Sequence, residues 1–200
     1  MSIADFYSTI WWPDVLALSE KHNFNYTGAI IETYENQTSG DLERNDDTST
    51  YRYFGNMLLS TGGELALHGY NHRPLCLDDF NYTTELSYRT WSSLDEIISS
   101  LKELESFSSN LFSDVQFSVY VPPSNILSSE ARAVIGEQFT SIKAIASTYA
   151  PGGATYSQEF EIASDGVIEM PRIVSGEDLS DYAQTMAFCE MNLHFVNSHF

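Results

Sequence analysis

Short apolar runs alternate with amphipathic helical segments along most of this chain. Residues 26–33 are a short run rich in β-branched residues, as in a strand buried on both faces, and residues 115–121 alternate like a strand. With no internal repeat and no linker, the alternation predicts one α/β domain over residues 1–200, with a mostly parallel sheet that is open or closed into a barrel. The expected strands are residues 26–33, 64–67, 115–121, 141–147 and 193–198, and the expected helices are 11–22, 49–60, one from residue 93 onward, 128–139 and 177–192.

Local signals mark several element ends. Pro13 suits the first turn of the expected helix at residues 11–22. Gly62-Gly63 ends the expected helix at residues 49–60. Ser93 followed by Glu96 has the spacing of a capping box ahead of an apolar helical face. The turn Ser164-Asp165-Gly166 predicts a β-hairpin between residues 159–162 and 167–173.

Composition limits the classes of partner. The chain is 42% hydrophobic and 14% aromatic, which is enough for one substantial core. Its formal charge of −19 argues against nucleic acid and anionic membrane surfaces and suits a neutral or cationic partner. No run of about 18 apolar residues is present, so no membrane span is expected. Cys76 and Cys189 are expected to be free thiols.

The most chemically informative motif is the histidine pair His68 and His72. The pair directly follows the expected strand at residues 64–67. Two imidazoles four residues apart can face one divalent metal ion if the backbone between them makes a helical turn. The spacing alone is a weak signal, because unligated loop histidines are common.

The positions of other polar residues strengthen the motif. In parallel α/β folds, ligands bind where the carboxyl ends of strands meet the following loops. His68 and His72, the turn Pro122-Pro123-Ser124-Asn125 and His199 each follow an expected strand. The sequence therefore predicts a site at this rim. His22 lies at the end of an expected helix and His194 at the start of an expected strand, so both are expected to be structural.

These stretches resemble three motifs of the polysaccharide deacetylases, the NodB-homology family of carbohydrate esterases. The matching stretches are His68-Gly69-Tyr70-Asn71-His72, Val121-Pro122-Pro123-Ser124 and Asn197-Ser198-His199, in the order of that family's second, third and fifth motifs. The resemblance implies a distorted, incomplete (β/α) barrel, here with a β-hairpin insertion. It covers about residues 13–199 and is closest to a divergent, uncharacterised branch.

The chain departs from the pattern of that family at three places. Gly69 replaces a serine or threonine, and Val121 stands where the third motif has an arginine, for which Arg172 is a possible substitute. The first motif, a strand that ends in paired aspartates, is expected before Trp11, where no such strand is present. Asp46-Asp47 is instead expected to lie in a solvated loop. The chain is therefore expected to be a fragment that lacks the first strand of the barrel.

The resemblance implies a metal-dependent N-deacetylase that acts on an N-acetylated amino-sugar polymer, with this fragment inactive. By resemblance, His68 and His72 bind a divalent metal ion, best zinc, and His199 protonates the departing sugar amine. The family also suggests an extracytoplasmic or cell-envelope location. The residues expected to contact the sugar are Tyr70, Pro123, Asn125 and Tyr149.

Two other functional classes stay open. One is a non-catalytic deacetylase-like module that binds a saccharide or a protein partner, which the missing aspartates and arginine favour. The other is a glycoside hydrolase, which needs two carboxylates at the rim. Its candidates are Glu32 and either Asp78 or Asp79.

Overall fold

The computed structural model describes residues 1–34, 42, 45–46, 48–78, 89–147, 160–174, 180–182, 184–185, 188–189 and 198–199, of which 147, 171–174 and 198–199 by backbone alone. Its helices are α1 (Ile3–Phe6), α2 (Trp12–His22), α3 (Ser49–Ser60), α5 (Leu94–Leu111) and α6 (Ser129–Gln138). Its strands are β1 (Thr27–Ile30), β2 (Glu64–Leu67), β3 (Val119–Tyr120), β4 (Ala144–Ser147), β5 (Glu161–Ile162), β6 (Ile168–Val174) and β7 (Ser198–His199). The shorter turns are a π-helical turn, η1 (Tyr7–Trp11), and the 3-10 turns η2 (Tyr70–His72) and η3 (Pro123–Asn125).

The strands form one mostly parallel sheet. Strands β1, β2, β3, β4 and β6 lie side by side in that order and run parallel to one another. Strand β5 pairs with β6 in the antiparallel direction, and β7 pairs with β6 in the parallel direction. Among the described strands β1 pairs with β2 alone, so the predicted α/β sheet is present and is open at this edge.

The two faces of the sheet differ in what covers them. Successive side chains of a strand point to opposite faces. One face carries large apolar side chains that share a core with α3, α5 and α6, namely Leu65, Leu67, Tyr120 and Ile145. The other carries smaller side chains in a separate cluster, namely Ala66, Val121 and Ala146. Within the described part of the chain, the helices that pack on the sheet thus cover one of its faces.

The helices begin and end close to where the local signals place them. Helix α2 has Pro13 in its first turn, and α3 ends just before Gly62-Gly63. At α5 the Oγ of Ser93 accepts a hydrogen bond from the backbone N of Glu96 at 3.3 Å. The Glu96 carboxylate accepts from the N and Oγ of Ser92, at 3.0 and 2.8 Å. The cap is therefore confirmed, but it is not the reciprocal capping box that the spacing suggested.

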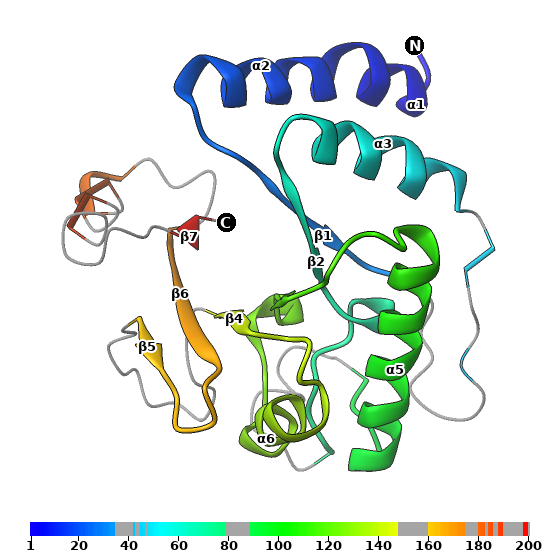
Figure 1. Cartoon of the computed structure of the whole chain (residues 1–200), viewed down its shortest axis with the longest axis vertical. Helices are drawn as coiled ribbons and strands as arrows, with labels where there is room; N and C mark the ends of the chain where they lie inside the picture. Colours follow the sequence, from blue (N-terminus) through cyan, green and yellow to red (C-terminus); the bar gives the residue numbers. More distant parts are fainter. Residues whose placement is uncertain are drawn as a thin grey trace.

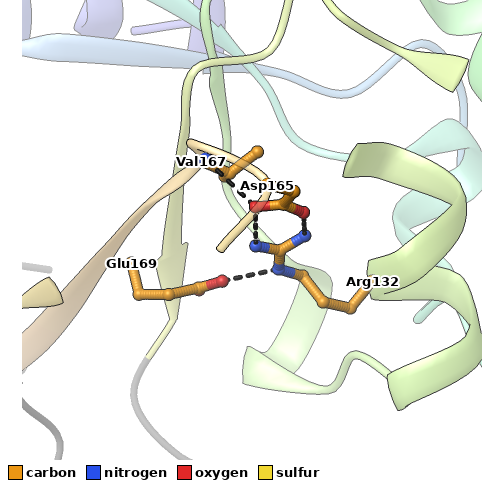
Figure 2. A network of polar contacts seen from close by, with 4 residues as sticks. All are labelled: Arg132, Asp165, Val167 and Glu169. Atoms are coloured by element: carbon orange, nitrogen blue, oxygen red, sulfur yellow. Dashed lines mark hydrogen bonds and ion pairs between the residues drawn. The ribbon is translucent and has the colours of Figure 1, made fainter. Parts of the chain in front are cut away.

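The predicted hairpin is confirmed and is tied to α6 by one arginine. Figure 2 shows Arg132 of α6 between two carboxylates of the hairpin. Its Nη1 donates to Asp165 Oδ2 at 2.7 Å and its Nε donates to Glu169 Oε1 at 2.5 Å. Asp165 also accepts a hydrogen bond from the backbone N of Val167 at 3.1 Å. These contacts fix the hairpin turn against the end of the molecule that carries α6 (Figure 1).

The amino-terminal segment differs from the resemblance in its order of elements. Residues 3–22 are helical throughout, as α1, η1 and α2. The strand that borders β2 on this side is β1, which follows α2 instead of preceding it. Figure 1 shows α2 and α3 running side by side at this end of the molecule. None of the described helices combines the length and apolar character needed to cross a bilayer.

One expected strand is shorter than the sequence suggested. Strand β3 covers Val119–Tyr120 alone, although the residues before it alternate in burial and Ser118 O accepts backbone hydrogen bonds from Lys143 N and Ala144 N. Phe117, for example, is buried in the core outside any strand. Of the expected strand at residues 193–198, residues 193–197 lie outside the described residues and Ser198 begins β7; much of the expected helix at 177–192 also lies outside them.

Candidate functional site

Two turns stand at the carboxyl edge of the sheet, after the neighbouring strands β2 and β3. Each turn holds two consecutive residues in the left-handed region of backbone conformation. They are Asn71 and His72 in η2, with φ of 56° and 52°, and Ser124 and Asn125 in η3, with φ of 52° and 60°. This conformation is uncommon for residues other than glycine, and it concentrates at functional sites.

The two turns are packed directly against each other. Gly69, which precedes η2, has φ of 91°, and a Cβ added there would lie 2.6 Å from Cγ of Pro123 in η3. Backbone hydrogen bonds hold the strand ends in register, since His68 N donates to Ile30 O at 2.8 Å. The turn after β2 is therefore fixed by both neighbouring strands.

His68 directly follows β2, and its side chain is buried, at 7% exposure. Its Nδ1 lies 2.7 Å from the carbonyl oxygen of Val121. Because a carbonyl oxygen can only accept, Nδ1 of His68 carries the hydrogen in this contact. Histidines that bind metals are commonly held in this way through the nitrogen that does not bind.

His72 lies against His68, as the spacing predicted. The two ring centroids are 4.9 Å apart, with the ring planes at 75°. Tyr34 stacks on His72 from the other side, with centroids 5.8 Å apart and planes at 22°. Burial lowers the pKa of His72, and the positive charge of Arg73 lowers it further. His72 is thus neutral at pH 7, which is the form that binds metal ions.

The backbone between the histidines is not the helical turn that the spacing suggested. Asn71 takes the left-handed conformation instead, and its buried side chain accepts a hydrogen bond from the hydroxyl of Thr33. Asparagine tolerates this conformation better than most residues. The side-chain contact therefore links the segment after β1 to the turn after β2 and sets the direction of His72.

The described residues supply two imidazoles to this site. Glu32, two residues past the end of β1, carries a fully buried carboxylate at 0% exposure. Across the described ranges, however, no group of three or more His, Cys, Asp or Glu side chains is arranged to hold a metal ion. Two neutral imidazoles are suitable donors for zinc, but a catalytic zinc ion has three protein ligands. The pair fits a bound divalent ion and does not by itself complete a hydrolytic centre.

The residues expected to contact a sugar have different surroundings. Tyr70 lies in the core at 2% exposure, with its ring centroid 6.4 Å from that of Trp91. Its ring therefore has no free face for a sugar, because packing against the core buries it, and the predicted stacking role is not supported. Pro123 is also buried, in η3. Asn125 has a buried Oδ1 without a hydrogen-bond partner in the described part of the chain, and this leaves one acceptor at the turn.

The structure describes the other two predicted site residues only in part. Tyr149 lies outside the described residues. His199 belongs to β7, and its backbone is paired with Val174 at the carboxyl end of β6. Because β2 and β6 run parallel, the carboxyl ends of these two strands face the same edge of the sheet. Along the sheet, β2 and β6 are separated by three strand spacings of about 4.8 Å each. The structure thus brings His68 and His72 together and places the backbone of residue 199 toward their edge.

Sequence reasoning missed three contributors to the site. They are the carbonyl of Val121, the hydroxyl of Thr33 and the ring of Tyr34. A backbone carbonyl leaves no mark in a sequence. Thr33 and Tyr34, by contrast, lie in the segment that follows β1, and applying the strand-end argument to that strand would have found them.

The fold and the site define an α/β protein with a histidine pair at the carboxyl edge of a mostly parallel sheet. The chain belongs to the family described as uncharacterised protein conserved in bacteria (DUF2194), whose match covers residues 1–200. No curated protein matches the chain.

Two solved structures of one pseudoenzyme resemble the chain. The wild-type CE4 family pseudoenzyme from Bacillus anthracis is 15% identical, with a TM-score of 0.43 over 66% of this chain and 37% of that chain. A mutant of this CE4 family pseudoenzyme with restored enzymatic activity is 12% identical, with a TM-score of 0.45 over 94% of this chain and 59% of that chain. The chain spans less than two thirds of the length of either structure.

Proposed function

We propose that this chain is a polysaccharide deacetylase-like domain that binds a divalent metal ion, best zinc, through His68 and His72. The observation that carries the proposal is the 2.7 Å hydrogen bond from His68 Nδ1 to Val121 O. The ring of His68 held in this way lies next to the ring of His72, with the two centroids 4.9 Å apart. The proposed reaction removes acetyl groups from an N-acetylated amino-sugar polymer outside the cytoplasm or at the cell envelope.

The residues of the chain have separate tasks in this proposal. His68 and His72 would hold the ion, and a bound zinc ion would acidify a water molecule and polarise a carbonyl oxygen. The Val121 carbonyl keeps His68 in the correct tautomer, and Tyr34 covers one face of His72. His199 is proposed as the group that protonates the leaving amine, because its strand ends at the same edge of the sheet.

A non-catalytic saccharide-binding module is the second candidate. The finding that favours it is the two-imidazole donor set, since no third ligand joins the pair within the described ranges. Such a module would keep the metal or the sugar contact without the hydrolytic step. Both candidates predict that His68 and His72 bind a metal ion, and they differ in whether acetate is released.

The test measures zinc and acetate on the same protein. The 200-residue chain is loaded with zinc, dialysed and analysed for bound metal, alongside His68→Ala, His72→Ala and the control His22→Ala, an exposed histidine at the end of α2. We expect about one zinc ion per chain, retained by His22→Ala and weakened at least about tenfold in the two site variants. Acetate release from N-acetylglucosamine oligomers would identify a deacetylase, and zinc binding without release would identify the binding module. Equal zinc content in all four proteins would refute both.

A further inference from the structure

A second site is a cavity of about 450 Å³ that lies between α2, α3 and β1. It shares no lining residue with the turns η2 and η3, so it is separate from the histidine pair. Figure 1 shows the two helices that line it, α2 and α3, running side by side. Its aromatic walls are formed by Trp11, Trp12, Tyr26, Tyr51, Phe54 and Phe112.

The walls of the cavity are uncharged. No Asp, Glu, Lys, Arg or His is among its lining residues. Two of its hydroxyls are already engaged within the chain: Thr27 Oγ1 donates to Glu64 Oε1 at 2.6 Å, and the Tyr51 hydroxyl donates to Ile31 O at 2.7 Å. A polar ligand would therefore lose hydrogen bonds to water with few replacements at these positions.

The aromatic rings are arranged around the opening. Trp12 stacks on Phe54 with ring centroids 5.5 Å apart and planes at 19°, and Trp11 meets Trp12 edge to face at 4.9 Å. Trp11 itself is 41% exposed. Beneath the rings the packing is tight, since a Cβ at Gly28 would lie 2.8 Å from Leu58 Cδ2. The empty volume is thus a gap between α2 and α3 with a closely packed floor.

We propose that this cavity binds a neutral, largely apolar small molecule that contains an aromatic or alicyclic ring. The volume is within the range of small-molecule sites, which are lined mainly by apolar and aromatic side chains. Charge decides against anionic ligands. The wall has no cation to pair with an anionic group, and the chain as a whole carries a formal charge of −19.

A pair of matched fluorescent probes tests the size and the charge of the ligand together. N-phenyl-1-naphthylamine is neutral, and 8-anilino-1-naphthalenesulfonate has the same ring system with a sulfonate added. We expect saturable binding of one neutral probe per chain, with the sulfonate probe at least about tenfold weaker because its charge has no partner in the wall. Quenching of tryptophan emission should accompany binding, because Trp11 and Trp12 line the cavity.

Substitutions then locate the probe. Val15 of α2 lines the cavity, whereas Leu18 on the same helix is exposed and does not, so Val15→Phe fills the space and Leu18→Phe is its control. We expect Val15→Phe to weaken the neutral probe about tenfold and Leu18→Phe to leave it unchanged. Thr50→Phe, an exposed lining position on α3, repeats the test if circular dichroism shows that Val15→Phe does not fold.

Three outcomes overturn the proposal. One is the absence of saturable binding of the neutral probe, which is also the result expected if a second copy of the chain covers the cavity. Another is equal affinity for the two probes. The third is an unchanged affinity in the folded filling variants, or an equal loss in Leu18→Phe, because the probe would then bind elsewhere.

Discussion

Thr33, just past the end of β1, donates its hydroxyl hydrogen to the side-chain oxygen of Asn71 in the turn after β2. Asn71 is buried, at 3% exposure, and holds a φ of 56°. The bond joins the loops of two neighbouring strands at the point where His72 leaves the backbone. The position of His72 therefore depends on a contact between segments 38 residues apart.

The two components of this contact can be separated by substitution. Asn71→Ala removes the hydrogen bond and puts alanine, which tolerates the left-handed conformation less well than asparagine, at this position. We expect it to lower the free energy of unfolding by about 2 kcal/mol. Asn71→Gly removes the hydrogen bond alone, and its loss should be smaller. Urea denaturation measures both values, and an equal loss in the two variants would show that the backbone conformation contributes nothing.

The tautomer of His68 is a direct spectroscopic prediction. Because Nδ1 donates to the carbonyl of Val121, we expect neutral His68 to carry its hydrogen on Nδ1. Long-range ¹H–¹⁵N correlation spectra of the metal-free protein distinguish the two nitrogens. His22, exposed at the end of α2, supplies the comparison signal of an unconstrained histidine. A hydrogen on Nε2 of His68 would contradict both the hydrogen bond and the proposed metal-binding role.

The contact between Arg132 and the hairpin predicts a pH dependence of stability. Hydrogen bonding to the guanidinium lowers the pKa of Asp165 from 3.8 to about 2, and the backbone N of Val167 lowers it further. A lowered pKa stabilises the folded state at pH values above the unfolded pKa, and this stabilisation is lost as the pH falls from about 4 to about 2. Arg132→Gln should therefore lose less stability than the parent protein over this interval.

The control for this measurement removes the same positive charge elsewhere and leaves the Arg132 contact in place. Lys102→Gln deletes an exposed positive charge on α5, at a distance from the hairpin in the sequence. It should keep the pH dependence of the parent protein. At neutral pH we expect Arg132→Gln to cost on the order of 1 kcal/mol, because the ion pairs are partly exposed. Parallel pH curves for the three proteins would show that Asp165 is not coupled to Arg132.

The amino-terminal cap of α6 is a further prediction. Ser128 Oγ accepts a hydrogen bond from the backbone N of Ala131 at 3.2 Å, and the residue is buried. Ser128→Ala should lower the free energy of unfolding by about 1 kcal/mol. The exposed neighbour Ser129 is the matched control, and Ser129→Ala should leave stability nearly unchanged. Chemical denaturation of both variants provides the comparison.

The sequence predicted elements well wherever the signal is local. The bounds of α3 and β2 agree with the expected ranges, and the turn at Ser164–Gly166 joins the expected antiparallel pair. Pairing was less predictable, as β3 shows. The alternation before Val119 reports which side chains are buried, but a strand also needs a neighbouring backbone in register, and that information lies elsewhere in the chain.

The site was predictable in its residues and not in its geometry. The spacing identified His68 and His72, whereas the left-handed backbone at Asn71 depends on contacts with Thr33 that come from tertiary packing. Tyr70 illustrates the opposite error. Its place beside the histidines suggested a contact with a sugar, but its ring is buried in the core near Trp91.

The close packing at Gly69 has a consequence for the imidazole next to it. Any side chain at residue 69 would press on Pro123 and push the second turn outward. That turn begins beside Val121, whose oxygen anchors the His68 ring. The absence of a Cβ at residue 69 therefore lets the two loops approach closely enough for the Val121 carbonyl to hold the His68 ring.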